Sequence, residues 1–409
     1  MPLLTIPRTH IARFERFTID GVLDETLREG AERCPFSVPA NEKSVLIDAI
    51  IDTGVKDIVY GSGPRDPEDL SGILDCLDQK NRLTAEIRFS FIMLLNCHHP
   101  ILPQFRNFPS QLKKYVTISF GMISYQANNG LFEKTLETLR SWGFDSFRVS
   151  LLNNFSAGVE EATYLRISEE INRTVAAGID IIRINDSLGT LYPETVAILA
   201  ANLRHDYPEL NFCLHAHNDR GLGIQNALAS IYNGFNLIEG GFAGTGNRSG
   251  LPAIEILDFI FKEKKISIKG KYFDSQKVLA AAHLTESTFL SIPDLYRPVS
   301  GLMVEQQNMG VANIPSYLGV TGNECYFLND VGLHNEAIRK IIADEGIYID
   351  NNNSVKLEMF KKKLAAEINN IANSKRNEYK HLKKAIEEFY KKDILYSAEV
   401  KERLKEFIS

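Results

Sequence analysis

Two histidines, His215 and His217, lie two residues apart near the end of an apolar run that begins at Asn211. Alternate residues of a β-strand point to the same face, so both imidazoles would leave the strand on one side. Neutral imidazoles are common ligands of divalent metals, and two of them make half of a four-coordinate site. The polar pair Asn218-Asp219 follows at once. We therefore interpret His215 and His217 as metal ligands rather than as ordinary polar residues at a strand end.

A carboxylate and a guanidinium that suit such a site occur near the start of the chain. Glu29 follows Arg28 shortly after a strand predicted at Gly21–Leu23. Neighbouring Arg and Glu residues usually form a plain ion pair. However, one carboxylate and two imidazoles with open coordination positions also suit a cation that chelates a 2-oxo acid. Arg28 would then stabilise an oxyanion or enolate next to the cation.

The elements that must position these residues are predicted by an alternation of short β-branched runs and longer segments of helical periodicity over residues 20–265. The strands are expected at Gly21–Leu23, Asp57–Tyr60, Ile87–Leu95, Tyr115–Phe120, Ser146–Ser150, Ile181–Asn185, Asn211–Ala216 and Leu237–Glu239. The helices between them are expected at Asn41–Asp52, Pro67–Asp78, Leu131–Trp142, Glu160–Ala177, Pro193–Arg204, Gly223–Asn233 and Pro252–Phe261.

This alternation predicts an α/β fold, a parallel (β/α)8 TIM barrel. The alternative is an open doubly wound sheet, but the first strand runs into Asp24–Gly30, which is not a glycine-rich phosphate-binding turn. In a closed barrel the first and seventh strands are two steps apart, and active sites lie at the carboxyl ends of the strands. Glu29, His215 and His217 are therefore expected to meet around one cation.

The character of the sequence changes after residue 268. Helical periodicity returns at Gln276–Phe289, Asn335–Asp344 and Val355–Phe407. The many Lys and Glu residues of the last segment are interpreted as a solvated helix face. We predict a TIM-barrel catalytic domain over residues 1–268 and a mostly helical C-terminal region of two subdomains over residues 269–409.

The composition limits the class of protein. Among 409 residues, 44% are hydrophobic and 24% charged, which excludes a disordered or collagen-like chain. The formal net charge of −6 argues against nucleic acid or an anionic membrane as a partner. Five cysteines without a CxxC pair indicate a reduced, cytoplasmic setting. The apolar run around Phe91–Leu95 is far shorter than the ~20 residues that cross a bilayer, and the N-terminus does not resemble a secretory signal.

Four segments resemble motifs of the DRE-TIM metallolyase superfamily. They are Asp24–Gly30, the strand-six motif Ile184–Gly189, the histidine segment His215–Asp219 and the glycine-rich loop Gly244–Gly250. Each alone is a weak signal, but together they come in the family's order and at barrel-like spacing. The resemblance supports a TIM barrel with one divalent ion (Zn, Mn, Mg or Co) as cofactor.

Two further segments, Pro298–Gly301 and Phe327–His334, resemble the helical region of isopropylmalate and homocitrate synthases. In that branch the histidine that corresponds to His334 assists proton removal, and the helical region reaches the active site of the partner subunit. The resemblance therefore implies a homodimer that exchanges its C-terminal regions. The alternative for His334 is a plain loop histidine.

Several positions favour the homocitrate synthase side. Glu29, rather than Asp, stands in the metal-site motif, as in that group. Arg148 and Ser150 resemble its Arg-x-Ser, in which the arginine holds the distal carboxylate of a dicarboxylic 2-oxo acid. An arginine fork suits this carboxylate because it can bind both oxygens. Cys97-His98 resembles its Cys-His, with His98 in contact with substrate. The alternatives are a salt bridge at a strand end for Arg148 and an exposed loop histidine for His98.

The resemblance implies an acyl-CoA:2-oxo acid acyltransferase that converts the acyl group to an alkyl group on transfer. Acetyl-CoA would be the co-substrate, although no residue can be assigned to its binding. The 2-oxo acid would be dicarboxylic, similar to 2-oxoglutarate or oxaloacetate. Arg28 would contact both the substrate and the developing oxyanion, and Ser187 of the strand-six motif would contact the substrate.

The chain also departs from the family pattern. Glu32 stands for the usual Gln, Tyr60 for a glutamate, Asn247 for a Glu and Leu251 for a metal-binding Asn of some relatives. These departures leave the substrate more open than the scaffold. One alternative is a lyase or aldolase of the same superfamily, although such a lyase would usually carry a cysteine in the Gly244–Gly250 loop. The other alternative is a catalytically altered metal-binding barrel.

Overall fold

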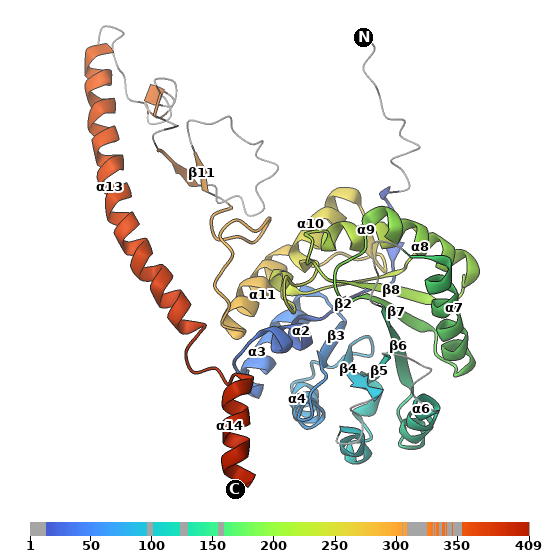
Figure 1. Cartoon of the computed structure of the whole chain (residues 1–409). Coiled ribbons are helices and arrows are strands. Elements are labelled where there is room, and N and C mark those ends of the chain that lie inside the picture. Colours follow the sequence, from blue (N-terminus) through green and yellow to red (C-terminus); the bar gives the residue numbers. More distant parts are fainter. Residues whose placement is uncertain are drawn as a thin grey trace, which may run out of the picture. The chain divides into compact units, whose positions relative to one another are not determined.

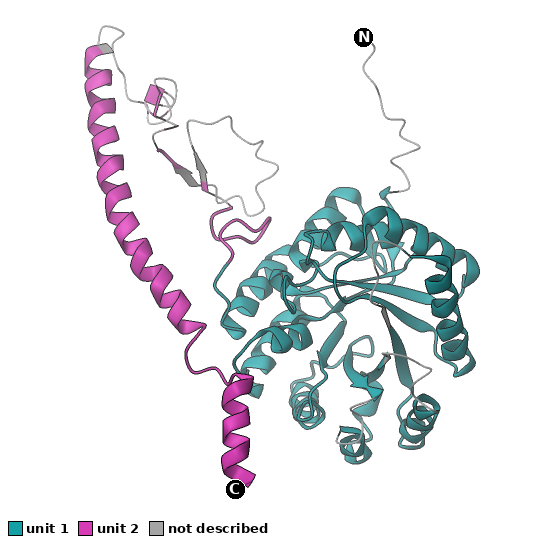
Figure 2. Ribbon diagram, viewed as in Figure 1, with its two compact units in different colours: residues 1–293 teal, residues 294–409 magenta. Residues whose placement is uncertain are grey.

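The computed structural model describes residues 14–95, 101–122, 130–153, 159–304, 306–308, 325–329 and 354–408, and single positions between residues 331 and 346. The chain forms two compact units, residues 1–293 and residues 294–409 (Figure 2). Each unit is described by itself.

Eight parallel strands form the centre of the first unit and are surrounded by helices (Figure 1). They are β2 (Gly21–Asp24), β3 (Asp57–Gly61), β4 (Arg88–Leu94), β5 (Val116–Met122), β6 (Ser146–Asn153), β7 (Ile181–Asp186), β8 (Asn211–Ala216) and β9 (Leu237–Gly240). The hydrogen-bonded order is β8-β7-β6-β5-β4-β3-β2-β9. β8 also lies next to β9, where the Phe212 amide donates to Asn236 Oδ1 at 3.0 Å. The predicted TIM barrel is confirmed.

The strands form because they are rich in β-branched and aromatic residues that are buried on both faces, as parallel strands require. The helices that follow them turn an apolar stripe toward the strands. These helices are α3 (Ala40–Thr53), α4 (Asp66–Gln79), α6 (Leu131–Ser141), α7 (Glu161–Ala176), α8 (Pro193–Asp206), α9 (Gly223–Tyr232) and α10 (Ile254–Lys264). The connection after β4 contains two short 3-10 helices, η3 (Leu102–Asn107) and η4 (Lys113–Tyr115).

Two features differ from the sequence-based expectation. A helix, α2 (Thr26–Arg33), begins directly after β2 and carries Arg28 and Glu29. The first unit also continues past the boundary expected after residue 268, because α11 (Ser275–Thr288) packs against α3 and α10. A small parallel pair, β1 (Thr18–Ile19) with β10 (Ser267–Ile268), ties the start of the barrel to its end.

The described residues of the second unit include a parallel strand pair and two helices. The strands are β11 (Gln306–Asn308) and β12 (Cys325–Phe327), and the helices are α13 (Ser354–Phe389) and α14 (Ser397–Ile408). The helix expected at Asn335–Asp344 lies largely outside the described residues. In the described part of the chain, no helix combines the length and the apolar character needed to span a membrane.

Candidate metal-binding active site

The three expected metal ligands converge at the carboxyl end of the barrel. Glu29 lies in the first turn of α2, after β2, whereas His215 and His217 lie at the end of β8. Glu29 Oε1 is 3.5 Å from His215 Nε2 and 3.8 Å from His217 Nε2, and the two Nε2 atoms are 3.1 Å apart. All three side chains are at least 95% buried. One cation at ordinary ligand distances of about 2.0–2.2 Å can therefore contact all three atoms.

The hydrogen bonds around His215 leave Nε2 free to act as a ligand. Its Nδ1 forms a short hydrogen bond with Glu239 on the adjacent strand β9, so Nδ1 carries the proton and Nε2 carries a lone pair. Burial, together with the nearby Arg183 guanidinium, holds the pKa of His215 well below its usual range, so the imidazole is neutral.

The glycine-rich loop after β9 fixes Glu29. The backbone amide of Asn247 donates to Glu29 Oε2 at 2.7 Å, which leaves Oε1 facing the histidines. The loop is tightly folded: Gly250 has a φ of +83°, and a Cβ atom there would lie 2.0 Å from the carbonyl oxygen of Gly244. Only glycine fits this position. The loop Gly244–Gly250 therefore holds Glu29 through a backbone amide, and it can do so even though Asn247 replaces the usual Glu.

A second glycine fixes the backbone at His217. Gly189, in the turn after β7, has a φ of +58°, and a Cβ atom there would lie 2.7 Å from the His217 carbonyl oxygen. The buried carboxylate of Asp186 holds this turn by accepting from the amides of Thr190 and Leu191. The motif Ile184–Gly189, at the end of β7, thus supports the end of the neighbouring strand β8.

Arg28 lies next to the ligands in a network of ion pairs. It pairs with Glu29, with Glu25 (Nε to Oε2, 2.5 Å) and with Glu32 (Nη1 to Oε1, 2.9 Å). Glu25 also pairs with the buried Arg183, which in turn pairs with Glu239. Burial alone would raise the pKa of Glu29, but the Arg28 guanidinium beside it holds this pKa below its usual range.

This network is defined as Glu25, Arg28, Glu29, Glu32, Arg183 and Glu239. Glu32 is exposed, so the remaining two guanidiniums and three carboxylates carry a formal charge of −1. A buried charge needs compensation. In addition, the Nε2 atoms of His215 and His217 face each other at 3.1 Å. A divalent cation at Glu29, His215 and His217 fits both observations, because it offsets the negative charge and accepts the converging lone pairs. It leaves His217 Nδ1 without a partner among the described residues.

A second group of possible ligand atoms, from Glu25, His215 and Glu239, also lies close together. Arg183 Nη2 already occupies this space, because it pairs with Glu25 and lies 2.6 Å from Glu239 Oε1 and 3.1 Å from His215 Nδ1. Of these two groups, the structure therefore favours Glu29, His215 and His217 as the site of a cation.

A pocket of about 170 Å³ opens in front of the three ligands. Its lining includes Arg28, Glu29, Glu32, Ile92, Leu94, Gly121, Ser150, Arg183, Asn185, Ser187, His215, His217, Asn247 and Arg248. Three of the residues predicted to contact the substrate, Arg28, Ser150 and Ser187, thus line the same pocket as the ligands. The lining is mostly polar and charged, and it includes two apolar side chains, Ile92 and Leu94.

The other predicted site residues are not placed in this pocket. Arg148 is 2% exposed and pairs with Asp57, the first residue of β3, so its guanidinium lies below the pocket lining. His98 lies outside the described residues. His334 is exposed and belongs to the second unit. The roles predicted for Arg148, His98 and His334 therefore stay predictions.

Sequence reasoning missed Glu25, Arg183 and Glu239. Each is at most 1% exposed and points into the barrel interior. A signal for two of them was present: Arg183 and Glu239 interrupt apolar strands, and a charged residue in a strand buried on both faces needs a partner inside. The partners themselves could not be read from the sequence, because they come from strands far apart in the chain.

Curated relatives include homocitrate synthases from Saccharolobus islandicus (strain L.S.2.15 / Lassen #1) and Sulfolobus acidocaldarius. The first is 26% identical over 242 residues, which cover 58% of this chain and 51% of the relative. The second is 25% identical over 293 residues, which cover 69% of this chain and 59% of the relative. The chain thus spans little more than half the length of these relatives.

Solved structures of similar fold include an HMG-CoA lyase from Acinetobacter baumannii in complex with coenzyme A and 3-methylmalate. It has a TM-score of 0.56 and 18% identity, and the match covers 73% of this chain and 98% of that one. Another is the carboxyl transferase domain of Rhizobium etli pyruvate carboxylase, with a TM-score of 0.54 and 12% identity, covering 69% and 50%. These likenesses concern the fold. The family model named HMGL-like matches residues 21–284, and the chain therefore belongs to the HMGL-like family.

Proposed function

We propose that this protein is a metal-dependent acyltransferase that joins acetyl-CoA to a 2-oxo acid in a Claisen-type condensation, similar to homocitrate synthase. The observation that carries the proposal is the convergence of Glu29, His215 and His217 beside Arg28 in one pocket. The homocitrate synthases among its relatives support this choice of reaction.

Glu29, His215 and His217 would hold the divalent ion. When bound, the ion supplies a Lewis acid that polarises the ketone of the 2-oxo acid. Arg28 lies beside Glu29, and its guanidinium can stabilise the negative charge that develops on the ketone oxygen. Because Glu25, Glu29 and Glu32 fix this guanidinium in advance, little reorganisation is needed during the reaction.

The carbon–carbon bond requires proton removal from the methyl group of acetyl-CoA. We propose His334 as the base, on the family resemblance and within the homodimer that the resemblance implies. The resulting enolate carbon attacks the ketone carbon, and the ketone oxygen becomes the hydroxyl of the product by taking up a proton. Water then cleaves the thioester, which releases free CoA and leaves a new carboxylate on the product.

We also propose that the 2-oxo acid substrate is dicarboxylic. Arg148 and Ser150 point to the same face of β6, and Ser150 lines the pocket. The Nε and Nη1 atoms of Arg148 are buried and have no hydrogen-bond partner among the described residues. A buried guanidinium with unused donors can receive a distal carboxylate that extends past Ser150. Asp57 competes for the same guanidinium, so this proposal needs a direct test.

The experiment is thiol release from acetyl-CoA, followed with a chromogenic thiol reagent across a panel of 2-oxo acids with one or two carboxylates. The proposal predicts release that depends on both the added metal and the 2-oxo acid, with the His217→Ala variant as the control. A lyase would instead cleave a 3-hydroxyacyl-CoA without net thiol release. Metal binding without turnover on any substrate would indicate a catalytically altered barrel and would contradict the proposal.

A further inference from the structure

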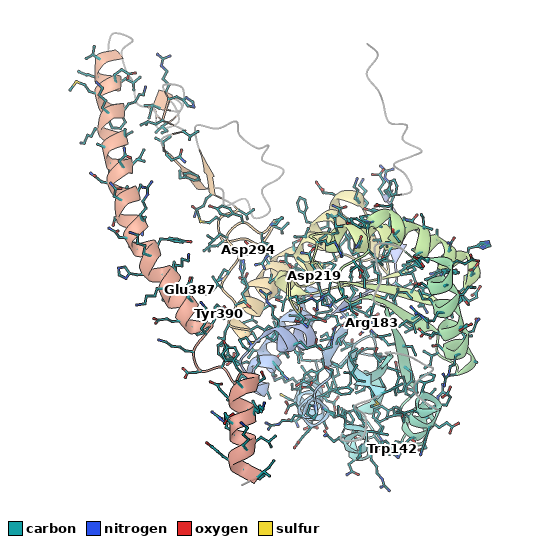
Figure 3. All side chains as sticks on the ribbon, in the orientation of Figure 1. Trp142, Arg183, Asp219, Asp294, Glu387 and Tyr390 are labelled. Carbon is teal, nitrogen blue, oxygen red and sulfur yellow. The ribbon has the colours of Figure 1, made fainter. Side chains whose placement is uncertain are left out.

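Three buried residues next to the proposed metal ligands, Glu25, Arg183 and Glu239, form one hydrogen-bonded cluster. Arg183 on β7 donates from Nε to Glu239 Oε2 at 2.9 Å and from Nη1 to Ser150 Oγ at 3.0 Å, and its Nη2 pairs with both Glu25 and Glu239. The three side chains are at most 1% exposed. Figure 3 labels Arg183 among the strands of the barrel. Every nitrogen of this guanidinium therefore has an acceptor.

This arrangement makes Arg183 a poor receptor for a substrate carboxylate, although it lines the pocket. Four of its five N–H groups already donate to Glu25, Glu239 and Ser150, so few donors remain for a substrate carboxylate. Arg183 also fills the space in which a second cation would otherwise contact Glu25, His215 and Glu239. Its role must therefore act through its two carboxylate partners.

Each partner leads to a different functional residue. Glu239 accepts a short hydrogen bond from Nδ1 of His215, whose Nε2 faces Glu29 and His217. Glu25 accepts from Nε of Arg28 at 2.5 Å. Both carboxylates are fixed by the same guanidinium. The cluster thus joins the metal ligand on β8 to the charged residue on α2 through one rigid centre.

We propose that Glu239, held by Arg183, is a positioning residue that keeps His215 in the tautomer with a proton on Nδ1 and a free lone pair on Nε2. Through Glu25, Arg183 fixes the orientation of Arg28 in the same way. Partners that orient a metal-bound imidazole commonly change metal affinity by 10–100-fold when they are removed. The proposal rests on the metal site of the proposed function, but its first readout does not require metal.

The informative variant is Glu239→Gln. The amide has one oxygen and one NH2 group, whereas Arg183 and His215 both donate to the carboxylate of Glu239. The NH2 group must therefore face one of two donors. If it faces His215, the imidazole must move its proton to Nε2. If it faces Arg183, the guanidinium loses an acceptor and the cluster loosens.

The first measurement is ¹⁵N NMR of histidine-labelled, metal-free full-length protein, with the His215 signal assigned from a His215→Asn variant. Wild-type protein should show His215 with its proton on Nδ1, and Glu239→Gln should shift the population toward a proton on Nε2 or give a mixture. A wild-type His215 with its proton on Nε2 would overturn the proposal, whatever the outcome of the activity assays.

The second measurement is the dissociation constant for Co²⁺, obtained by competition with a chromophoric chelator, together with the Co²⁺ absorption spectrum. Glu239→Gln should weaken binding about 10–100-fold and alter the spectrum. Glu239→Asp keeps the charge and should restore part of the affinity, and it replaces Glu239→Gln if that variant does not fold. The matched control is Asp258→Asn, because Asp258 is a buried carboxylate that pairs with Lys262 on α10, outside the pocket lining.

Unchanged Co²⁺ affinity in a folded Glu239→Gln variant would overturn the proposal, as would an equal loss in Asp258→Asn. If wild-type protein itself binds no Co²⁺, the proposed function fails. The NMR result would then decide by itself whether Glu239 fixes the tautomer of His215.

Discussion

Two arginines of the barrel interior, Arg183 on β7 and Arg148 on β6, are almost completely buried but have opposite surroundings. Arg183 has an acceptor on each of its three nitrogens. Arg148 has one short pair with Asp57, and its Nε and Nη1 find no partner among the described residues. The guanidinium of Arg183 is thus fully engaged within the charged network, whereas the guanidinium of Arg148 has donors that are not used by the described residues. Under the proposed function, this difference predicts that the metal site is preorganised and that the contacts of Arg148 are completed only when the substrate binds.

The largest expected effect is on the metal side. Replacing His217 by Ala removes one of three ligands, and we expect metal retention to be abolished, well beyond the 10–100-fold loss typical of outer partners. Metal content of purified protein, measured by ICP-MS, checks this. Full metal occupancy in the variant would show that His217 is not a ligand. The contrast drawn between the surroundings of Arg183 and Arg148 would then have no bearing on metal binding.

The next effect concerns Arg28. Replacing Arg28 by Lys keeps a positive charge among Glu25, Glu29 and Glu32 but loses the fork that pairs with all three. We expect kcat to fall about 10²–10³-fold, as for the loss of one donor to a developing oxyanion. Metal content should stay at the wild-type level. A variant that loses metal in proportion to its activity would mean that Arg28 acts through the ligands and not on the substrate.

On the β6 side, replacing Arg148 by Met keeps the bulk but removes the donors. If Arg148 binds a distal carboxylate, kcat/KM for dicarboxylic 2-oxo acids should fall about 10–100-fold, the range expected for a charged hydrogen bond, while monocarboxylic ones change little. Steady-state kinetics over both substrate classes measures this. Equal losses in both classes would assign Arg148 to the structure alone, through its pair with Asp57.

A smaller effect is expected from the backbone that supports His217. In Gly189→Ala the new methyl group would meet the His217 carbonyl oxygen at 2.7 Å, at a φ that L residues rarely adopt. We expect a loss of about 1–3 kcal/mol in stability and a lower Tm, with weaker Co²⁺ binding. Gly72→Ala is the control, because its added methyl group meets no atom within 4 Å among the described residues. Similar behaviour of both variants would exclude a specific role for Gly189.

The smallest effect concerns Asp24, a buried carboxyl at the end of β2. Burial raises its pKa to about 7, and its Oδ2 has no partner among the described residues. A raised carboxyl pKa favours the folded state at low pH, and this stability is lost as the pH rises from the unfolded value near 4 through 7. Asp24→Asn should therefore reduce the fall in Tm between pH 5 and pH 8, measured by calorimetry of metal-free protein.

Glu170 provides the comparison for Asp24, because burial raises its pKa to about 7 as well, on the outer helix α7. Glu170→Gln should reduce the same slope by a smaller amount, because its carboxyl is less deeply buried. A slope that neither variant changes would contradict the linkage for both residues.

The barrel could be predicted from the sequence to a large extent. All eight barrel strands lie at their predicted positions to within three residues at each end, because strands buried on both faces read as short apolar runs separated by helical periodicity. Helix α2 was missed because it is only eight residues long and mostly polar, with Arg28, Glu29, Glu32 and Arg33 among its residues. The first unit ends at residue 293 rather than at the expected residue 268, because α11 packs on α3, and this packing joins residues more than 200 positions apart.

The site was predictable where a motif marks it. Glu29, His215 and His217 meet as expected because their strands and loops are fixed by the barrel. The cluster of Glu25, Arg183 and Glu239 was not found, because pairing between strands decides which buried charges meet. For Arg148, sequence alone could not show that Asp57 takes part of its guanidinium. The predicted roles of His98 and His334 are not tested, because His98 lies outside the described residues and His334 belongs to the second unit.

The most direct test of the central claim is anomalous diffraction from crystals of the full-length protein grown with Zn²⁺ or Mn²⁺, recorded at the absorption edge of the metal. We predict one anomalous peak per chain, at about 2.0–2.2 Å from Glu29 Oε1 and from the Nε2 atoms of His215 and His217. A peak coordinated by other residues, or a pocket without a peak in a protein that binds the metal in solution, would contradict the account.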